Sequence, residues 1–322
     1  MSTSPAGPGR AAIVVLGSAT MDLVAYARTA PALGETVTGE SFRTVPGGKG
    51  ANQAIAAAPA GGAVTMIGAV GDDDFGPRLR AALDGAGVGT GPLRTVPGAG
   101  GTAHIVVDAE GDNAIVVVPG ANGTVTGLAA GDEAVVAGAG ALLLQLELPL
   151  SAALSGARAA RRHGVRTVLT PAPAQPLPDE LPAVTDLLVP NGHEAAALSG
   201  RQDPRAAARV LLEAVPGVVI TLGSAGCFYA LRGAEPLSVP AYRVKAVDTT
   251  AAGDTFAGAL AVALGEGRPM PRAPAWATAA SSLSVERAGA SSSMPDRAEI
   301  DARAAAPPSP TLAAGERPPR TP

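Results

Sequence analysis

The chain of 322 residues is 47% hydrophobic and 16% charged, a composition that supplies a large buried core and excludes global disorder. Its net charge of −4 gives no basic excess, so we expect neither a nucleic-acid partner nor binding to an anionic membrane. The longest stretches free of charge and proline are too short to span a bilayer, and the single cysteine cannot form an internal disulfide, which indicates a cytoplasmic protein.

In chain order, residues 1–10 are expected to be a flexible N-terminus, after which short β-branched segments alternate with Ala- and Leu-rich segments. The predicted strands are Ile13–Leu16, Val64–Val70, Leu142–Glu147, Arg166–Thr170, Leu187–Val189 and Val218–Leu222. The predicted helices are Ala51–Ala58, Pro77–Asp84, Leu150–Arg162, Glu194–Leu198 and Pro204–Ala214. This alternation predicts an α/β fold with a mostly parallel central sheet flanked by helices on both faces. Ligands of such sheets bind outside the carboxyl ends of the strands.

Two segments depart from this alternation. Glu35–Val45 and Thr102–Val118 have the alternation and turns of hairpins, and they predict a small β-lid inserted from about residues 35–46 and 100–119. An edge extension of the main sheet is the alternative. We expect the lid and the α/β unit to form one domain over residues 11–303. Residues 304–322 are proline-rich and aperiodic, which predicts a disordered tail.

The segment Ala246–Leu264 leads from a strand exit through small residues into an apolar helix. The backbone amides of Ala251 to Asp254 at the start of that helix would form an anion-binding site. A carboxylate beside an anion site could accept the proton of a hydroxyl as it attacks phosphorus, which would make Asp254 a catalytic base. The alternative is that Asp254 only caps the helix.

The segment Val45–Ala58 is rich in glycine and contains an isolated Lys49. It is not a Walker loop, because Lys49 is followed by Gly50 rather than by Ser or Thr. Its glycines allow unusual backbone angles, and Lys49 and Asn52 offer donors suited to sugar hydroxyls. A plain glycine-rich turn into an Ala-rich helix is the alternative.

Two further segments have open interpretations. Asn191 and Glu194, three residues apart at a helix start, would form a capping box or would orient Mg²⁺ through its waters. Ile220–Phe228 is a buried strand that ends in Gly223 and Gly226, as in a nucleotide-binding turn or a simple hairpin. The three histidines lie far apart in sequence and predict no zinc site.

Together these segments resemble the ribokinases of the PfkB family of carbohydrate kinases, from about Ile13 to Asp301. GGKGANQ and DTTAAGDTF occupy the places of the two family signatures, and VTGE, VGDDD, QLE, PAPA and PNxxE occur in the order of the family. The resemblance implies a ribokinase-like fold in which the β-lid often forms a homodimer interface.

The resemblance also implies roles by position. Asp254 would be the catalytic base, beside an anion hole made by Ala251, Ala252 and Gly253. The sugar would contact Thr20, Met21, Asp22, Gly48, Lys49, Gly50, Ala51, Asn52, Glu147 and Asp254. ATP would contact Asn191, Thr221, Leu222, Gly223, Ser224, Ala225, Gly226, Gly253, Asp254 and Thr278.

Two metal ions are implied as cofactors. Mg²⁺ would accompany ATP, with Glu194 holding it through water. K⁺ would activate the enzyme at positions that supply oxygens, several through backbone carbonyls: Asp248, Thr250, Ser284, Arg287, Gly289 and Ser293.

The resemblance implies ATP-dependent phosphorylation of D-ribose at its 5-hydroxyl, which gives ribose 5-phosphate. The alternatives are another PfkB sugar kinase acting on deoxyribose, fructose or a nucleoside, and a catalytically dead regulator that binds a sugar or a nucleotide. Three positions depart from the family pattern. Thr20 stands where ribokinases typically have a sugar-contacting Asn, and Thr278 where a His often meets the adenine. Pro59 follows the glycine-rich helix and is predicted to end it early.

Overall fold

A nine-stranded sheet forms the centre of the molecule in the computed structural model, which describes residues 10–306. From β11 across to β5 the strands run parallel, and β12 and β13 extend one edge in antiparallel fashion. In spatial order the strands are β13 (Leu237–Val239), β12 (Cys227–Leu231), β11 (Gly217–Thr221), β10 (Leu187–Leu188), β9 (Arg166–Leu169), β8 (Ala141–Leu144), β1 (Ala12–Leu16), β4 (Ala63–Gly71) and β5 (Leu93–Val96).

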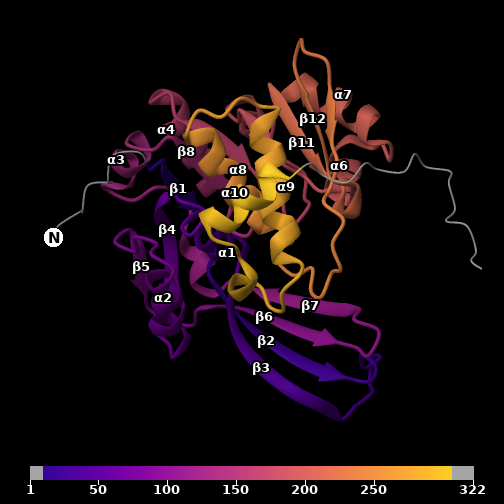
Figure 1. Ribbon diagram of the computed structural model, residues 1–322. Helices are drawn as coiled ribbons and strands as arrows, with labels where there is room; N and C mark the ends of the chain where they lie inside the picture. Colours follow the sequence, from indigo (N-terminus) through magenta and orange to yellow (C-terminus); the bar gives the residue numbers. More distant parts are fainter. Residues whose placement is uncertain (1–9, 307–322) are drawn as a thin grey trace, which may run out of the picture.

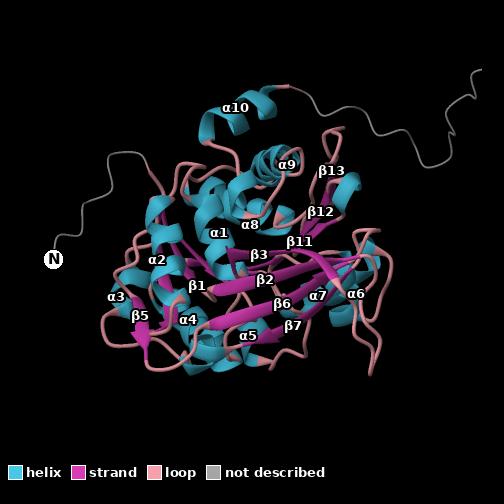
Figure 2. Ribbon diagram, turned by 90° about the horizontal axis from the view of Figure 1, so that it is seen from below, coloured by secondary structure: helices cyan, strands magenta, loops and turns pink. Residues whose placement is uncertain are grey.

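Helices cover both faces of this sheet (Figure 2). One face carries α1 (Lys49–Ala57), α2 (Phe75–Gly85), α8 (Ala252–Gly265) and α9 (Arg272–Ser284), with α10 (Arg297–Ala305) packed on α9. The other face carries α3 (Asp132–Ala137), α4 (Leu150–Arg162), α5 (Glu180–Ala183), α6 (Gly192–Ser199) and α7 (Pro204–Ala214). Short 3₁₀ turns η1 (Gly120–Thr124), η2 (Gly223–Ala225) and η3 (Ser291–Ser293) complete the elements.

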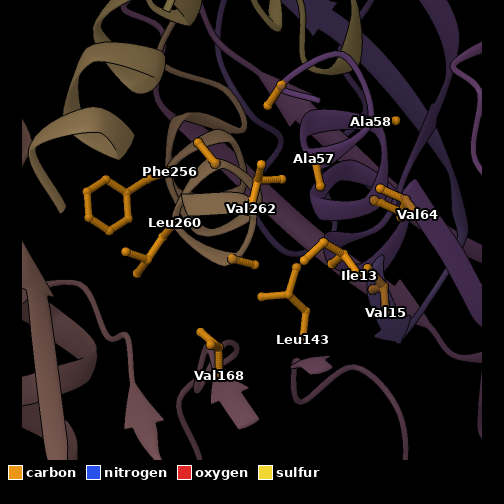
Figure 3. Close-up of a cluster of buried hydrophobic side chains, with 14 of the residues drawn as sticks. Ile13, Val15, Ala57, Ala58, Val64, Leu143, Val168, Phe256, Leu260 and Val262 are labelled. Carbon is orange, nitrogen blue, oxygen red and sulfur yellow. The ribbon is translucent and has the colours of Figure 1, made fainter. Parts of the chain in front are cut away.

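Two hydrophobic clusters, one on each face, follow from the alternation of side chains along the central strands. In β1, Ile13 and Val15 belong to the cluster under α1 and α8, whereas Val14 and Leu16 belong to the cluster under α4. Figure 3 shows the first cluster, in which Leu260 of α8 lies near the side chains of the central strands. Because both faces are covered, these strands are continuous apolar runs, which is why they are recognisable in the sequence.

A second, four-stranded sheet projects from the body (Figure 1). Its strands, in spatial order, are β3 (Gly39–Gly47), β2 (Thr20–Ala27), β6 (Gly101–Val107) and β7 (Asn113–Val118). It includes both segments with hairpin patterns and is separate from the central sheet, so the edge-extension alternative is wrong. Thr20 pairs with Gly47 and with Gly101, so this end of the four-stranded sheet lies next to the N-terminus of α1.

The predicted central strands and helices are present, with ends that differ by a few residues, whereas β5, β13, α3, α5 and α9 were not predicted. One difference matters for the site, because β8 ends at Leu144 rather than at Glu147. Glu147 therefore lies in the loop beyond the strand, from which it reaches α1. Strand β2 was not predicted, although Met21, Leu23, Ala25 and Ala27 alternate along it. Helix α1 ends at Ala57, two residues before Pro59, as that proline predicts.

The predicted flexible and disordered ends need correction where the structure describes them. Arg10 is anchored, because its guanidinium donates to the carbonyl of Gly62 (2.6 Å). Ala304 and Ala305 belong to α10 rather than to a disordered tail. This helix begins with a capping box at Asp296 and is held by the indole of Trp276, which donates to Asp301 (2.7 Å). Residues 1–9 and 307–322 lie outside the described residues.

Within residues 10–306, no helix is long and apolar enough to cross a bilayer.

Candidate active site

Two adjoining cavities lie beyond the carboxyl ends of the parallel strands. The larger, of about 570 Å³, lies between the β11–β12 hairpin and helices α8 and α9, and the smaller, of about 210 Å³, lies at the N-terminus of α8. Both are lined by Thr221, Thr249, Ala252 and Gly253. The smaller cavity is also lined by Lys49, Asn191, Glu194 and Asp254. Residues more than 200 positions apart in sequence thus converge at one place, as the parallel sheet predicts.

Asp254 lies buried in the first turn of α8. Its Oδ1 accepts a hydrogen bond from Gln53 Nε2 (3.1 Å), and its Oδ2 accepts one from Asn52 Nδ2 (3.3 Å). The helix is capped without a side chain, so the hypothesis that Asp254 is its cap is wrong. Burial raises the pKa of Asp254 to about 6, a value at which a carboxylate is a stronger base than in water.

The start of α8 has an unusual backbone. Ala251 has a φ of 57°, and among residues 10–306 it is the only non-glycine residue in the left-handed region. The first N–H groups of a helix have no acceptor within the helix. The N–H of Ala252 donates to the carbonyl of Thr249 (3.2 Å), whereas those of Gly253 and Asp254 are left at the helix start, where the dipole favours an anion.

The glycine-rich loop before α1 packs tightly against the turn between β1 and β2. Gly48 has a φ of 93°, and a Cβ atom there would lie 2.8 Å from the backbone N of Thr20. A Cβ atom on Gly50 would lie 2.5 Å from the backbone N of Ser18. Only glycine fits these positions, and the close approach brings Lys49, at the start of α1, near Asp22 of β2.

Glu147 fixes the beginning of α1 from outside the helix. Its Oε2 accepts hydrogen bonds from the hydroxyl of Ser18 (2.5 Å) and from the backbone N–H of Lys49 (2.9 Å). A carboxylate at a helix N-terminus is stabilised by the helix dipole. Because both of these bonds go to Oε2, Oε1 of Glu147 is the oxygen left for a ligand.

Asp22 lies beside these groups on β2. Its Oδ1 accepts a hydrogen bond from the hydroxyl of Thr20 (3.1 Å). Burial raises the pKa of Asp22 to about 6; the bond from Thr20 and the charge of Lys49 lower it, while the charge of Glu147 raises it. The charges of Lys49 and Glu147 therefore both lie close enough to Asp22 to act on it.

Two predicted sugar contacts have side chains directed elsewhere. Met21 and Ala51 are buried in the hydrophobic cluster under α1, so any contact from them to a ligand would come from the backbone. Thr20 is also buried, at 3% exposed, and its hydroxyl is engaged with Asp22.

The larger cavity is lined mainly by small and apolar residues. The β11–β12 segment is an antiparallel hairpin, and its turn lines the cavity, so the two interpretations of its glycines are compatible. Gly223, Ser224 and Gly226 line the cavity, whereas Leu222 packs against the cluster on the other face. Ala225 is not among the lining residues. The lining residues outside the hairpin include Ala241, Tyr242, Val244, Phe256, Thr278 and Val285.

Asn191 and Glu194 form the capping box that their spacing predicts. The side chain of Asn191 accepts from the backbone N–H of Glu194, and that of Glu194 accepts from the backbone N–H of Asn191, both at 2.8 Å. Both residues line the smaller cavity, so the capping role does not exclude a ligand. Burial raises the pKa of Glu194, and a cation bound nearby would favour its ionised form.

The residues predicted to meet K⁺ lie in the loop before α8 and in the segment from the end of α9 to η3, and Asp248 joins the two. Its Oδ1 accepts from the N–H of Thr250 and its Oδ2 from the N–H of Gly289, both at 2.9 Å. Burial raises the pKa of Asp248, but these hydrogen bonds outweigh it and hold the pKa below its usual range. The hydroxyl of Ser293 donates to the carbonyl of Ala290 (2.7 Å). The first loop continues into Ala251, so its shape bears directly on the start of α8.

The donor set at this place suits a monovalent cation better than a divalent one. The guanidinium of Arg287 pairs with Glu299, so only the carbonyl oxygen of Arg287 can meet a cation. The carbonyl of Ser284 accepts from the N–H of Arg287 (3.1 Å) and keeps a second lone pair. One carboxylate among neutral oxygens carries little charge, and within the described residues no cluster of three or more His, Cys, Asp or Glu residues could hold a metal ion.

Four polar residues of the site were missed by sequence reasoning. Gln53 contacts Asp254, and Gln145 contacts Gln53. Ser18 joins Glu147 to α1, and Asn122 exchanges two hydrogen bonds with the backbone of Ala19 (2.9 and 3.0 Å). Gln53 directly follows Asn52 in the glycine-rich segment, which is the one signal that could have identified it.

Comparisons with known proteins identify the family of this chain. The family model described as pfkB family carbohydrate kinase matches residues 10–297. The chain is 41% identical over 306 residues to the ribokinase of Schizosaccharomyces pombe, covering 90% of this chain and 96% of that one. It is 42% identical over 292 residues to the ribokinase of Bacillus subtilis, covering 90% of this chain and 98% of that one.

Among solved structures, the Arabidopsis thaliana ribokinase complexed with ribose and ATP superposes with a TM-score of 0.86 at 33% identity, covering 92% of this chain and 99% of that chain. A family model that spans most of the chain and relatives of this identity lead to one conclusion: the chain belongs to the pfkB family of carbohydrate kinases.

Proposed function

We propose that this chain transfers the γ-phosphoryl group of ATP to the 5-hydroxyl of D-ribose and releases ribose 5-phosphate. The observation that carries the proposal is the position of Asp254, a buried carboxylate at the N-terminus of α8, between a polar cluster and a nucleotide-sized cavity. The relatives named ribokinase and the Arabidopsis complex with ribose and ATP support the choice of substrates.

The polar cluster holds the sugar in this proposal. Asp22 and Glu147 each have one carboxylate oxygen engaged within the protein, which fixes the side chain and leaves the other oxygen for a sugar hydroxyl. Lys49 and Asn52 supply donors from α1. Such pre-oriented groups hold the 5-hydroxyl near the phosphorus and reduce the entropy that the reaction step must still lose.

Asp254 accepts the proton of the 5-hydroxyl group while the oxygen of that hydroxyl attacks the γ-phosphorus of ATP. The O–H bond breaks, a new O–P bond forms, and ADP leaves with the electrons of the cleaved P–O bond. The amides at the start of α8 donate to the oxygens of the transferring group. These donors are fixed by the helix before the reaction and do not have to reorganise.

ATP occupies the larger cavity in this proposal, with its base between the β11–β12 hairpin and α9 and its phosphates toward Gly253. Mg²⁺, when bound with ATP, supplies charge neutralisation of the phosphates, and Asn191 and Glu194 would hold it through water. Asp248, together with carbonyl and hydroxyl oxygens of the segment from Ser284 at the end of α9 to Ser293, would hold K⁺. The charge of the ion would stabilise the turn that leads into α8.

The four-stranded sheet has the properties of a lid and of an interface. It begins at Thr20 and Gly47, beside the sugar cluster, so its movement would cover the sugar and exclude water. It also exposes large apolar side chains, with Phe42 at 63%, Ile115 at 52% and Val116 at 65%. Exposed large apolar side chains are frequent at interaction surfaces, and we propose that two copies of the chain associate through this sheet.

The proposed setting is the cytoplasm, where ATP and sugar phosphates are available. Cys227 is buried and free, as expected in a reducing compartment.

Thr20 favours a second candidate, phosphorylation of 2-deoxyribose. Its hydroxyl is engaged with Asp22, so it offers less to the sugar than a longer amide would. A site that lacks a polar contact discriminates less against a sugar that lacks the matching hydroxyl.

A coupled assay of ADP release tests the proposal with ribose, deoxyribose, fructose and nucleosides as acceptors. We expect turnover that requires both Mg²⁺ and a sugar, with ribose giving the highest kcat/KM and with little ATP hydrolysis in the absence of sugar. A higher kcat/KM for another acceptor would replace ribose as the substrate. Sugar binding without turnover across the whole set would contradict the catalytic function itself.

A further inference from the structure

Gln53 is completely buried on α1, directly beside the proposed base. Its Nε2 donates to Oδ1 of Asp254 (3.1 Å) and lies within hydrogen-bond distance of the hydroxyl of Thr170 (3.3 Å). Its Oε1 accepts from Nε2 of Gln145 (2.6 Å). Glutamine is seldom fully buried, and a buried amide must be hydrogen-bonded to be tolerated. Both polar atoms of this side chain are hydrogen-bonded, and one of the bonds goes directly to Asp254.

The bonding pattern fixes the direction of both amides. An ionised carboxylate only accepts hydrogen bonds, so the NH₂ group of Gln53 must face Asp254 and its oxygen must face away. That oxygen receives the NH₂ group of Gln145, a residue just beyond the end of β8. Turning either amide over would bring two oxygens or two NH₂ groups together. The side chain of Gln53 is thus locked with its donor toward the base.

The two oxygens of Asp254 are therefore not equivalent. Oδ1 has the shorter bond, from a residue that is completely buried and that lines neither cavity. Oδ2 has only the longer bond from Asn52 (3.3 Å), the neighbour that the sugar is proposed to contact. We propose that Gln53 is a positioning residue, which occupies Oδ1 and stabilises the carboxylate so that Oδ2 receives the proton of the sugar hydroxyl.

The charges and dipoles around Asp254 support this role. Burial is the largest influence on its pKa and raises it; Lys49, then Gln53 lower the pKa, Glu147 raises it and Asn52 lowers it. Gln53 is thus the strongest neutral group that keeps the carboxylate ionised. Without its donor, only Lys49 and Asn52 would oppose burial and the charge of Glu147.

The test compares Gln53→Met with the wild-type protein and with Gln145→Met. Methionine has a similar volume and flexibility but no donor, so it removes the bond to Asp254 and preserves the packing. Gln145→Met makes the same chemical change at an equally buried position that does not contact Asp254. It is therefore the matched control for the loss of a buried amide.

Carbon NMR of protein labelled at the aspartate carboxyl carbons measures the pKa of Asp254 without any substrate, and Asp254→Asn identifies its signal. Loss of a hydrogen bond to a charged group corresponds to a rise of about one to two pH units. We expect this rise for Gln53→Met and a smaller one for Gln145→Met. The same shift should appear in the acid limb of the pH profile of kcat, together with a fall in kcat of roughly tenfold even at high pH, because the carboxylate is less well oriented.

Gln53→Glu is the second variant, in case Gln53→Met does not fold. It has nearly the shape of the wild-type side chain and places a second carboxyl group against Asp254, so the pair should retain a proton to still higher pH. Gln53 variants with an unchanged pKa and an unchanged kcat would show that Gln53 only fills the core, as would equal losses for Gln53→Met and Gln145→Met.

This inference rests on the proposed function only for the substrate of the kinetic measurement. If the wild-type protein phosphorylates no sugar, the proposed function fails, whereas the NMR titration still decides whether Gln53 controls the ionisation of Asp254.

Discussion

The two ends of the candidate site are built in different ways. The proposed sugar end consists of charged and polar side chains. Glu147 and Asp254 are held by hydrogen bonds from other segments, and Asp22 by one from Thr20 on its own strand. The nucleotide end is a cavity of about 570 Å³ lined mostly by small and apolar residues and by backbone. Fixed polar groups discriminate between ligands that differ by one hydroxyl, whereas an apolar cavity discriminates weakly.

This difference indicates where substitutions should have large effects. At the sugar end, a changed side chain leaves buried partners without hydrogen bonds, which costs about 1–3 kcal/mol per group. At the nucleotide end, Thr278 stands where the family often has a His, which removes one contact with the ligand. It leaves no buried group without a hydrogen bond, since the hydroxyl of Thr278 donates to the carbonyl of Pro274 (2.8 Å). The departures of this chain from the family pattern are therefore more informative near Asp22 than near Thr278.

The largest expected effect is on kcat and concerns Asp254, which lies between the two ends. Asp254→Asn should lower kcat by roughly 10²–10⁴, because the amide cannot accept the proton, while the KM for the sugar changes little. Steady-state kinetics at saturating ATP measures both quantities. A fall in kcat of less than about tenfold would show that Asp254 is not the base.

The second prediction concerns the free energy of unfolding, which is lowered at neutral pH because the charge of Asp22 is buried. Burial raises the pKa of Asp22 from an ordinary 3.8 to about 6, so the folded protein holds this proton more tightly than the unfolded chain. The stabilisation is complete below the unfolded pKa and is lost as the pH rises through the folded pKa. Asp22→Asn should therefore exceed the wild-type protein in unfolding free energy by about 1–3 kcal/mol above about pH 7 and by little near pH 4.

Thermal unfolding across this pH range measures the difference, and the variant should also bind sugar less tightly. Asp248→Asn, compared in a buffer without K⁺, is the control of opposite sign. The pKa of Asp248 is held below its usual range by the N–H groups of Thr250 and Gly289, so its loss should destabilise the protein at high pH. A wild-type protein more stable than Asp22→Asn at high pH would contradict the account of the sugar end.

The third prediction concerns the cation loops beside the nucleotide end. Activity should be severalfold higher in K⁺ than in Na⁺ or in a bulky organic cation at the same ionic strength, because Asp248 and neutral oxygens offer a weakly charged site. Asp248→Asn should remove most of this dependence. Equal rates in the three salts would contradict the cation site, and the shape of the loops would then depend on Asp248 alone.

The smallest predicted effect is at Thr20. Thr20→Asn should raise the ratio of kcat/KM for ribose over deoxyribose. The expected change corresponds to the free energy of one hydrogen bond, roughly 0.5–1.5 kcal/mol. The hydroxyl of Thr20 is occupied by Asp22, whereas an amide could bond Asp22 and a sugar hydroxyl together. Kinetics of both sugars with both proteins measures the ratio. If the ratio does not change, a bound water already supplies the contact, and Thr20 does not select the sugar.

Much of the fold was predictable because its signals are local. The buried parallel strands are short apolar runs, and the capping box of Asn191 and Glu194 is set by residues three positions apart. Strand β2 was missed because Asp22 interrupts its apolar character. Helix α10 was missed although Asp296 and Glu299 have the spacing of a capping box, since Ile300 is its only buried residue and the helix has no apolar periodicity.

The sequence motifs indicated several residues that the structure brings together, but not Gln53, Gln145, Ser18 or Asn122 and not the contacts among them. The motifs indicated Asp254, Lys49 and Glu147, but the bond from Gln53 joins residues 201 positions apart, and no local pattern encodes it. The capping hypothesis for Asp254 failed for the same reason, because its partners lie on α1 rather than in its own helix. Contacts between distant segments depend on how the helices pack.

Identification of the product tests the central claim most directly. Wild-type protein is incubated with ATP, Mg²⁺ and ribose, and phosphorus NMR with proton coupling locates the new phosphate ester. We predict a single phosphomonoester on the carbon-5 oxygen of ribose, formed in equal amount to ADP, and almost none with Asp254→Asn. A phosphate on carbon 1, or ADP with inorganic phosphate and no sugar ester, would contradict the claim.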